Sequence, residues 1–238
     1  MNEKQKVHFT HLGRMGYKEA WDYQDVLMQK ALKVKALVHA DDKSEIEAGD
    51  TEHHLLFVEH PPVYTLGKSG KIEHVLINEE QRQEKGIQFF NTNRGGDITF
   101  HGPGQLVGYP ILDLEKFYTD IGRYLRELEE VVILTLAEYG IQSGRSKGET
   151  GVWIDADVKG KERKICAMGV RCSRWVTMHG FALNVNTDLN YFNYIIPCGI
   201  QNKQVTSIQK ELGHQVPMAE VEEKLKANFE KVFGVELV

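Results

Sequence analysis

The sequence predicts an α+β fold in which helices flank a mixed sheet. Three observations lead to this prediction: an amphipathic segment near each end of the chain, a third one near its middle, and strand-like runs grouped between them. The 238 residues allow one large domain or two small ones. No linker rich in glycine, serine or proline divides them, so we expect a single domain over residues 1–238.

Three helices are predicted from apolar residues at helical spacing. The first covers residues 17 to about 37, the second runs from Ile121 to a stop at Gly140, and the third runs from near Pro217 to Gly234. Their apolar residues are Tyr17, Ala20, Trp21, Met28 and Ala31, then Ile121, Tyr124, Leu125, Leu128, Val132 and Tyr139, then Met218, Val221, Leu225, Phe229 and Val232.

Strands are predicted where short apolar runs meet turn residues. The acidic stretch 40–50 is expected to be an exposed loop, and turns are expected at 158–161 and 172–174. The strand-like runs are 54–59, 63–66, 86–91 and 98–100, followed by a meander at 151–155, 164–171 and 175–185.

Composition narrows the class of protein. Lys plus Arg number 29 and Asp plus Glu number 34, a net charge of −5, so nothing favours a nucleic-acid partner. No apolar run reaches the roughly 18 residues that span a bilayer, and the polar N-terminus lacks a signal-peptide core. Three cysteines without paired spacing argue against a disulfide framework. We expect a cytoplasmic protein without a membrane association.

The most informative stretch is Arg94-Gly95-Gly96-Asp97-Ile98-Thr99-Phe100-His101-Gly102-Pro103-Gly104-Gln105. Glycine lets a backbone approach a ligand closely, and histidine exchanges protons near neutral pH. The stretch fits a hairpin with glycine-rich turns equally well. It has neither the spacing of a P-loop nor that of a dinucleotide fingerprint.

Three further segments carry chemistry, each with an ordinary structural alternative. Cys198, between Pro197 and Gly199, suits an exposed thiol, but a free cysteine is more often core. Lys164 could act as a base or stabilise a thiolate, or it could simply end a strand. The run 179–184 alternates small and large residues, which fits either a groove or sheet packing. Neither H-E-x-x-H nor C-x-x-C is present, so we expect no metal.

Together these segments resemble the lipoyl(octanoyl) transferases. Four blocks match in order: 94–105, Lys164-Ile165 through Gly169-Val170, His179-Gly180-Phe181-Ala182-Leu183-Asn184, and Pro197-Cys198-Gly199-Ile200. The combination is specific, although no single block is. The resemblance implies the fold of the biotin/lipoate protein ligase catalytic domain.

The resemblance also implies an activity, in which octanoyl passes from acyl carrier protein to a lysine of a lipoyl domain. The acceptors would be the lipoyl domains of 2-oxoacid dehydrogenases and the glycine cleavage H protein. Cys198 matches the position of the acyl-thioester and Lys164 the lysine that assists it. No cofactor, ATP or metal is implied, and we expect a monomer. The matching substrate-binding positions are Arg94, Gly95, Gly96, Asp97, Ile98, Thr99, Phe100, His101, Ala167, Met168, Gly169, Gly180, Phe181 and Ala182.

Two expectations concern the shape of such a site. Small residues would leave room for the octanoyl tail at Gly95, Gly96, Gly169, Gly180 and Ala182. Cys166 stands where a small residue such as alanine is expected. Strand alternation would place its thiol on the face of Lys164, where a chemical probe could label it.

Other readings of these residues remain. An ATP-dependent lipoate or biotin ligase of the same fold would need no cysteine, and an amidotransferase between lipoyl proteins would use one. A non-catalytic protein that binds acyl carrier protein or lipoyl domains is the alternative from another class. Basic residues of the meander turns would dock acidic partners, or would only form a solvated edge: Arg145, Lys147, Lys159, Lys161, Arg163, Arg171 and Arg174.

Overall fold

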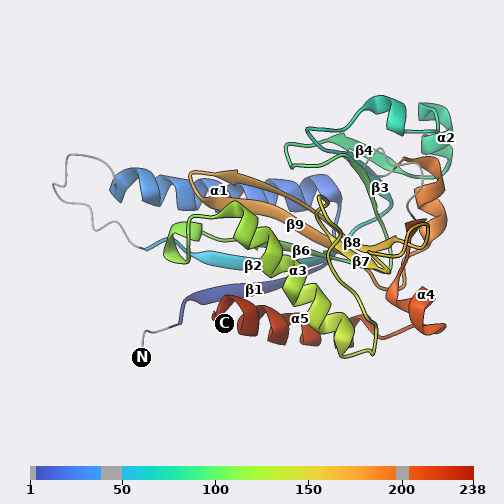
Figure 1. Cartoon of the computed structure of the whole chain (residues 1–238). Helices are drawn as coiled ribbons and strands as arrows, with labels where there is room; N and C mark the ends of the chain where they lie inside the picture. The colour runs from blue at the N-terminus through green and yellow to red at the C-terminus, as the bar shows by residue number, and fades with distance from the viewer. Residues whose placement is uncertain (1–3, 39–49, 197–203) are drawn as a thin grey trace.

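The computed structural model describes residues 4–38, 50–196 and 204–238, and within them eight strands form one large sheet (Figure 1). The strand order is β10-β8-β9-β6-β2-β1-β11, with β7 pairing on β8. The pairs β1–β2, β1–β11 and β8–β10 are parallel and the others antiparallel, so the sheet is mixed as predicted. The strands are β1 (Lys6–Arg14), β2 (His53–Glu59), β6 (Gln105–Ile111), β7 (Val152–Ile154), β8 (Arg163–Ser173), β9 (Val176–Asn184), β10 (Gln204–Val205) and β11 (Glu236–Leu237).

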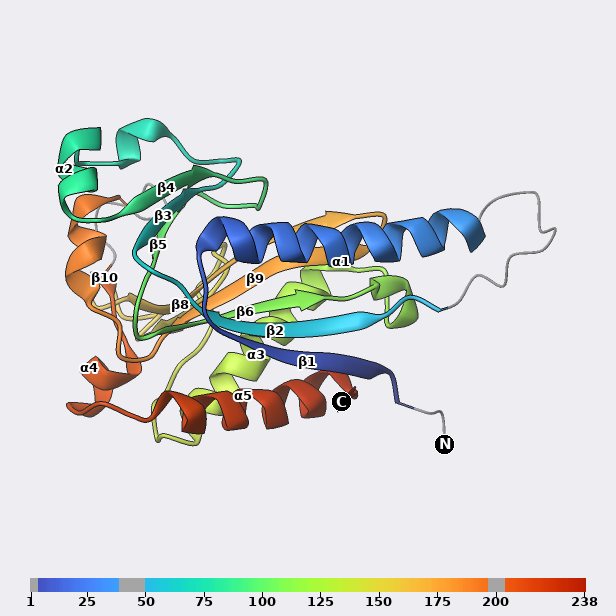
Figure 2. The same cartoon turned by 180° about the vertical axis from the view of Figure 1, so that it is seen from behind.

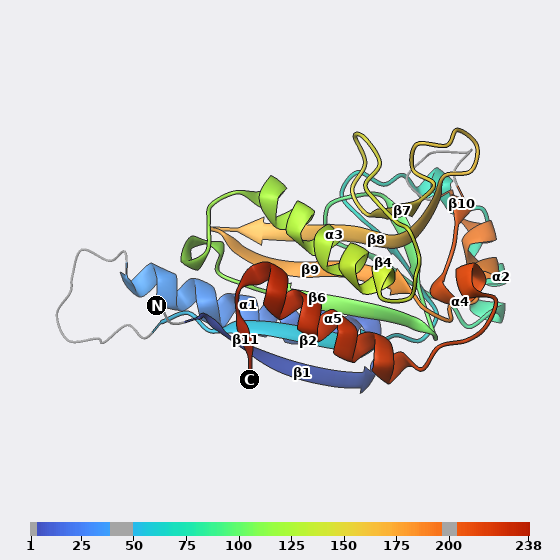
Figure 3. The ribbon, with the colours of Figure 1, turned by 60° about the horizontal axis from the view of Figure 1, so that its bottom comes forward.

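Helices cover both faces of this sheet. The helix α1 (Tyr17–Val38) lies on one face, which is nearer the viewer in Figure 2. The helices α3 (Ile121–Ala137) and α5 (Met218–Phe233) lie side by side on the opposite face, which is in front in Figure 3. The short helix α4 (Ile208–Leu212) precedes α5. Each face therefore has its own buried apolar cluster, one under α1 and one under α3 and α5.

A second, smaller sheet stands beside the end of the large sheet at which α1 begins (Figures 1 and 2). Its strands are β3 (Val63–Leu66), β4 (Gln88–Asn91) and β5 (Ile98–His101), in the order β4-β3-β5. The short helix α2 (Glu79–Glu84) and the 3-10 turn η1 (Ile72–His74) cover it, together with η3 (Leu189–Tyr194). A separate apolar cluster fills this part: Tyr64, Leu66, Ile87, Ile98, Phe100, Phe192 and Ile195.

Local chemistry explains where the helices begin and end. The Asp120 carboxylate accepts the Arg123 N–H at the start of α3, which satisfies one amide that has no helical partner. Gly140, with a φ of 72°, follows α3, and Gly234, with a φ of 66°, ends α5. Both adopt the left-handed conformation that glycine accommodates without a steric penalty.

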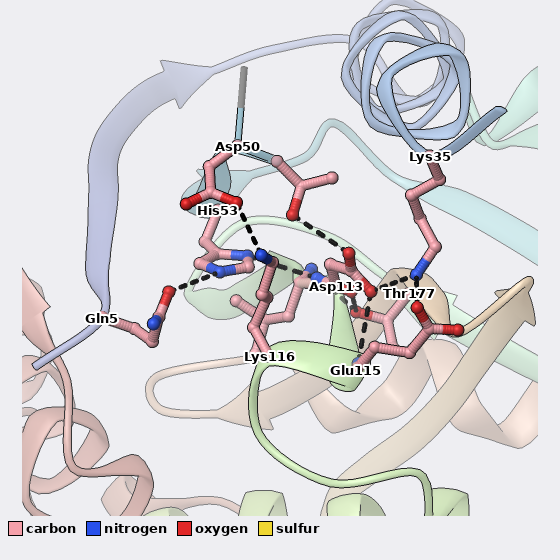
Figure 4. A network of polar contacts seen from close by, with 10 residues as sticks. Gln5, Lys35, Asp50, His53, Asp113, Glu115, Lys116 and Thr177 are labelled. Carbon is pink, nitrogen blue, oxygen red and sulfur yellow. Dashed lines mark hydrogen bonds and ion pairs between the residues drawn. The ribbon is translucent and has the colours of Figure 1, made fainter. Parts of the chain in front are cut away.

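A polar network lies at the far end of the large sheet, between the last turn of α1 and the strand β6 (Figure 4). The Lys35 ammonium lies 2.5 Å from an Asp113 carboxylate oxygen, and both side chains are buried. Thr51 donates a hydrogen bond to the other Asp113 oxygen, and the Asp113 N–H donates to His53 Nδ1. The 3-10 turn η2 (Leu114–Lys116) starts on the same carboxylate.

Most predicted elements are present, with differences at their ends. All three predicted helices form, and Tyr139 lies just beyond α3. The turn expected at 172–174 is wrong by a residue or two, because Arg174 and Trp175 form the tip with left-handed φ values while β8 continues to Ser173. Apart from Asp50, the loop expected at 40–50 lies outside the described residues. In the described ranges, no helix combines the length and apolarity needed to cross a membrane.

Candidate active site

A cavity of about 610 Å³ lies between the two sheets. Its size is in the range of small-ligand sites, which is roughly 300–1,000 Å³. One wall is the loop 94–97 with the start of β5, and the other is the middle of the paired strands β8 and β9. The start of α1 contributes Tyr17, and β6 contributes Val107 and Tyr109.

The structure brings nearly all the predicted substrate-binding residues to this cavity. The exception is Phe100, which is 1% exposed and stacks on Tyr191 at 4.5 Å between ring centroids inside the core of the small sheet. Strand alternation explains this, because Thr99 and His101 face the opposite side from Phe100. The residues that do line the cavity are Arg94, Gly95, Gly96, Asp97, Ile98, Thr99, His101, Ala167, Met168, Gly169, Gly180, Phe181 and Ala182.

Lys164 lies at one end of the cavity. It is half-buried, and its ammonium nitrogen lies 4.6 Å from the centroid of the Trp153 ring, within cation–π distance. Its backbone is fixed by pairing with Trp153 of β7 and Val205 of β10, and its carbonyl accepts the Thr206 N–H. Two neighbouring segments, β7 and β10, therefore hold this lysine in position.

Cys198, the predicted nucleophile, lies outside the described residues, but the chain on either side of it is placed. The Ile196 N–H donates to the His74 carbonyl at 2.8 Å, next to the small sheet. On the other side, Val205 pairs with Lys164 and lines the cavity. The described residues that precede and follow the predicted nucleophile are thus attached to different sheets.

Two of the small residues expected to leave room for the octanoyl tail, Gly169 and Gly180, do not do so. A Cβ on Gly180 would lie 2.2 Å from the Gly108 carbonyl oxygen, and a Cβ on Gly169 would lie 2.7 Å from the Gly95 oxygen. The space that these glycines leave is therefore taken by neighbouring backbone and not by a ligand. They bring the strands and the loop 94–97 into contact, which builds the walls of the cavity.

Arg94 holds that loop in shape. Its guanidinium donates hydrogen bonds to the carbonyls of Thr65, Gly95 and Asp97 at 2.6–2.9 Å. The side chain is buried, so it places a positive charge beside the cavity. Arg94 therefore holds in place the loop 94–97, which forms one wall of the cavity.

A chain of side-chain hydrogen bonds connects the sequence blocks to each other. His101 Nδ1 donates to Gln105 Oε1 at 2.8 Å, and Gln105 Nε2 donates to Asn184 Oδ1 at 2.9 Å. The Asn184 amide then donates to the carbonyl of Thr206, whose own N–H binds the carbonyl of Lys164. All three side chains are buried, so the chain fixes β10 against β8 at the lysine.

Burial keeps two histidines and a tyrosine of the cavity uncharged. It lowers the pKa of His101 well below its usual value, helped by the neighbouring His60. It lowers the pKa of His179 to about 3, helped by the charges of Arg94 and Arg171. Burial also raises the pKa of Tyr17 to about 12. The middle of the cavity is therefore suited to an uncharged, largely apolar group.

Cys166 does not offer a second thiol to the site. Val152 pairs with Cys166 and Trp153 with Lys164, so Ile165 is an extra residue that interrupts the alternation of β8. Cys166 is 0% exposed within the core under α3 and α5, and burial raises the pKa of its thiol. Cys172 is exposed, near the tip of the β8–β9 hairpin.

Several cavity residues were not singled out from the sequence: Tyr17, Gln105, Val107, Tyr109, His179 and Asn184. Gln105 lies inside the block 94–105, and His179 and Asn184 lie inside the block 179–184. These two blocks therefore already indicated the three residues. Tyr17 was taken only as an apolar residue of a helix. Val107 and Tyr109 lie on β6, a strand that the sequence did not predict.

The comparisons with known proteins agree with this architecture. The family described as lipoyl protein ligase A/B catalytic domain matches residues 16–230. A bi-partite lipoate protein ligase from Thermoplasma acidophilum superposes with a TM-score of 0.68 over 98% of this chain and 86% of its own, at 16% identity. A biotin protein ligase from Aquifex aeolicus gives a TM-score of 0.51 over 95% of this chain and 70% of its own, at 14% identity. At such identities, the solved structures support the fold alone.

The chain belongs to the lipoyl protein ligase A/B catalytic-domain family, as the match over most of its length shows. Within that family it groups with the octanoyltransferases. An octanoyltransferase from Flavobacterium johnsoniae is 56% identical over 98% of this chain and 99% of its own length. One from Christiangramia forsetii is 56% identical over 98% of this chain and 97% of its own.

Proposed function

We propose that this octanoyltransferase works through an acyl-thioester on Cys198, with Lys164 as the residue that activates the thiol. The donor would be octanoyl-acyl carrier protein, and the acceptor a lysine of a lipoyl domain. The observation that carries the proposal is one cavity that joins three of the four sequence blocks, with Lys164 at its end. The fourth block, 197–200, lies in the chain between Ile196 and Val205, and Val205 pairs with that lysine.

The reaction divides into two transfers. The Cys198 sulfur attacks the octanoyl carbonyl carbon, the carbon–sulfur bond to the carrier breaks, and the carrier thiol leaves with the proton. The acceptor amine then attacks the enzyme thioester, a carbon–nitrogen bond forms, and Cys198 leaves as the thiol after taking a proton. Exchange between thioesters is nearly isoenergetic and amide formation is downhill, so neither transfer requires ATP.

Lys164 has the surroundings of a group that assists a thiol. A cysteine with an ordinary pKa of about 8.5 is only a few per cent thiolate at neutral pH, so a nearby cation increases the reactive fraction. The Trp153 ring face favours a cation at the Lys164 nitrogen. The octanoyl tail would lie in the middle of the cavity, across the face that the paired residues Ala167 and Ala182 share.

Docking of two protein substrates would use the loops on either side of β7 (Figure 3), the strand whose Trp153 pairs with Lys164. Arg145 and Arg163 are already paired with carboxylates of this chain, and Arg171 lies 3.8 Å from Asp25. Lys147, Lys159 and Lys161 are exposed in these loops. These three lysines are the cations best placed to meet an acidic carrier.

The test is the mass of the intact protein after incubation with octanoyl-acyl carrier protein in the absence of ATP. We expect one octanoyl adduct on the wild type and none on Cys198→Ala, with discharge of the adduct by an apo-lipoyl domain. Cys172→Ala removes an exposed thiol distant from Lys164 along β8, and it should load like the wild type. An adduct that persists on Cys198→Ala would refute the assignment of the nucleophile. Transfer that requires ATP would favour a ligase, the activity of the structural relatives.

A further inference from the structure

We propose that the His179 imidazole is the end wall of the acyl site and sets the length of the fatty acyl chain that the enzyme accepts. The proposal rests on the proposed function, because it assumes that the cavity holds the acyl tail. It concerns a residue that touches the far end of the substrate and takes no part in the bond changes.

The register of β8 and β9 gives the cavity a direction and a length. From Lys164 the strand β8 passes Ala167, opposite Ala182, and reaches Val170, opposite His179. Six residues at a rise of about 3.3 Å each separate Lys164 from Val170 by at most about 20 Å, since the bulge at Ile165 shortens the strand. An octanoyl chain has seven carbon–carbon bonds of about 1.5 Å, so it extends at most about 10 Å.

The strand span and the length of the octanoyl chain together indicate where the methyl end of the acyl chain lies. The lysine side chain, the reacting carbonyl and the contacts between them occupy the first part of the 20 Å span. The acyl chain then lies over the paired residues Ala167 and Ala182 and ends near Gly169 and His179. His179 is 1% exposed and lines the cavity, so it is the side chain that such a methyl group would meet.

The backbone of His179 is held in an unusual conformation. Its φ of 58° is left-handed in the middle of a strand, where a residue with a Cβ is strained. The strand register places it opposite Pro110 of β6, which has no N–H to donate. The His179 N–H instead donates to Gln24 Oε1 of α1, at 2.9 Å. The strain is therefore maintained by contacts that turn this residue out of the regular ladder.

The imidazole ring is equally constrained. Its Nε2 donates to Asn93 Oδ1 at 2.8 Å, and the ring lies between Trp21 and Tyr109, at 5.9 and 6.5 Å between centroids. Because burial disfavours the protonated form, the ring is an uncharged surface against which a methyl group can pack. A ring fixed on three sides is a rigid stop, which is what a selective chain-length limit requires.

The proposal is tested by a competition among octanoyl-, decanoyl- and dodecanoyl-acyl carrier proteins in one vessel. The products on an apo-lipoyl domain are measured by intact mass. The variant is His179→Gly, because glycine accepts the left-handed backbone without strain while the ring is removed. We expect the ratio of dodecanoyl to octanoyl product to rise at least about tenfold, since a single methylene in an apolar pocket is worth roughly 10–200-fold. The ratio does not depend on the fraction of active enzyme.

Two further variants complete the experiment. Arg174→Gly makes the same backbone change at an exposed left-handed residue, φ 48°, at the hairpin tip, and it should leave the ratio unchanged. His179→Asn keeps a side chain that tolerates this conformation, and it should give an intermediate ratio even if the glycine variant fails to fold.

A wild-type ratio in both His179 variants would overturn the proposal while leaving octanoyl transfer intact. If the wild type transferred none of the three chains, the proposed function itself would fall. An equal rise in Arg174→Gly would show that the ratio responds to general loosening of the fold, and would also overturn the proposal.

Discussion

At the scale of single residues, burial holds a set of histidines uncharged around the cavity and the sheet. Burial lowers the pKa of His60 to about 4, although its Nδ1 donates to the Met15 carbonyl. His53 is likewise lowered to a pKa of about 4, and His179 to about 3. Each of them releases a proton on folding at mildly acidic pH, which ties the stability of the protein to pH.

We therefore predict that stability falls between pH 6.5 and 4.5. The unfolded chain binds protons as the pH drops below 6.5 while these folded histidines do not, so the free energy of unfolding decreases by up to about 1.4 kcal/mol per pH unit for each histidine. Urea denaturation at several pH values measures the slope. His60→Asn should lower that slope, whereas exposed His214→Asn should leave it unchanged. Equal slopes in all three proteins would refute the attribution.

At the scale of elements, the end of α1 is attached to β6 and η2 through the buried Lys35–Asp113 pair (Figure 4). Helix α1 also forms an exposed pair, in which Lys30 lies 2.7 Å from Glu52, just before β2, and the two side chains are 62% and 46% exposed. The two pairs have similar geometry and very different surroundings. They offer a comparison of what burial does to an ion pair.

Lys35→Met should destabilise the protein by about 3–5 kcal/mol, because it leaves the Asp113 carboxylate buried without its cation. Lys30→Met should cost less than about 1 kcal/mol, because water and salt screen the exposed pair. Denaturant unfolding of the two variants gives the difference. Similar losses in both would mean that solvent reaches Asp113.

The sequence predicted those elements whose pattern agrees with their environment. Helices α3 and α5 have one apolar face, and each is followed within three residues by a glycine in the left-handed conformation. The strand β6 was not predicted, since Gly108 and Pro110 interrupt the usual strand composition, although the strand is buried throughout. Gly108 is needed because the Phe181 ring lies where its Cβ would be, and Pro110 is opposite the displaced His179. These are tertiary reasons that no local pattern contains.

The candidate site was likewise predictable from the sequence only in part. The glycine-rich block and the strands around Lys164 were recognised as blocks, and the fold brings them together. Three-dimensional packing decided the rest: Phe100 turns into a core, a bulge at Ile165 separates Cys166 from Lys164, and Gly180 serves backbone contact. The role of Cys198 remains a prediction.

At the scale of the whole molecule, the cavity lies between two sheets that have separate apolar cores. The small sheet has strands of four residues and one modest cluster, while the large sheet is supported on both faces. The loop 94–97 meets β8 through the Gly95 N–H, which donates to the Val170 carbonyl. Regions with less buried apolar surface open at a lower free energy than the core.

Heat should therefore inactivate the enzyme before it unfolds. We predict that the temperature of half-maximal activity lies several degrees below the midpoint of far-ultraviolet circular dichroism. Phe100→Leu, in the small core, should widen this gap, whereas Val132→Ala, on the buried face of α3, should lower both temperatures together. Coincident midpoints in the wild type and in Phe100→Leu would contradict this. If activity is lost before the chain unfolds, the smaller sheet sets the highest temperature at which the enzyme works. Stabilising the larger sheet would not raise that temperature.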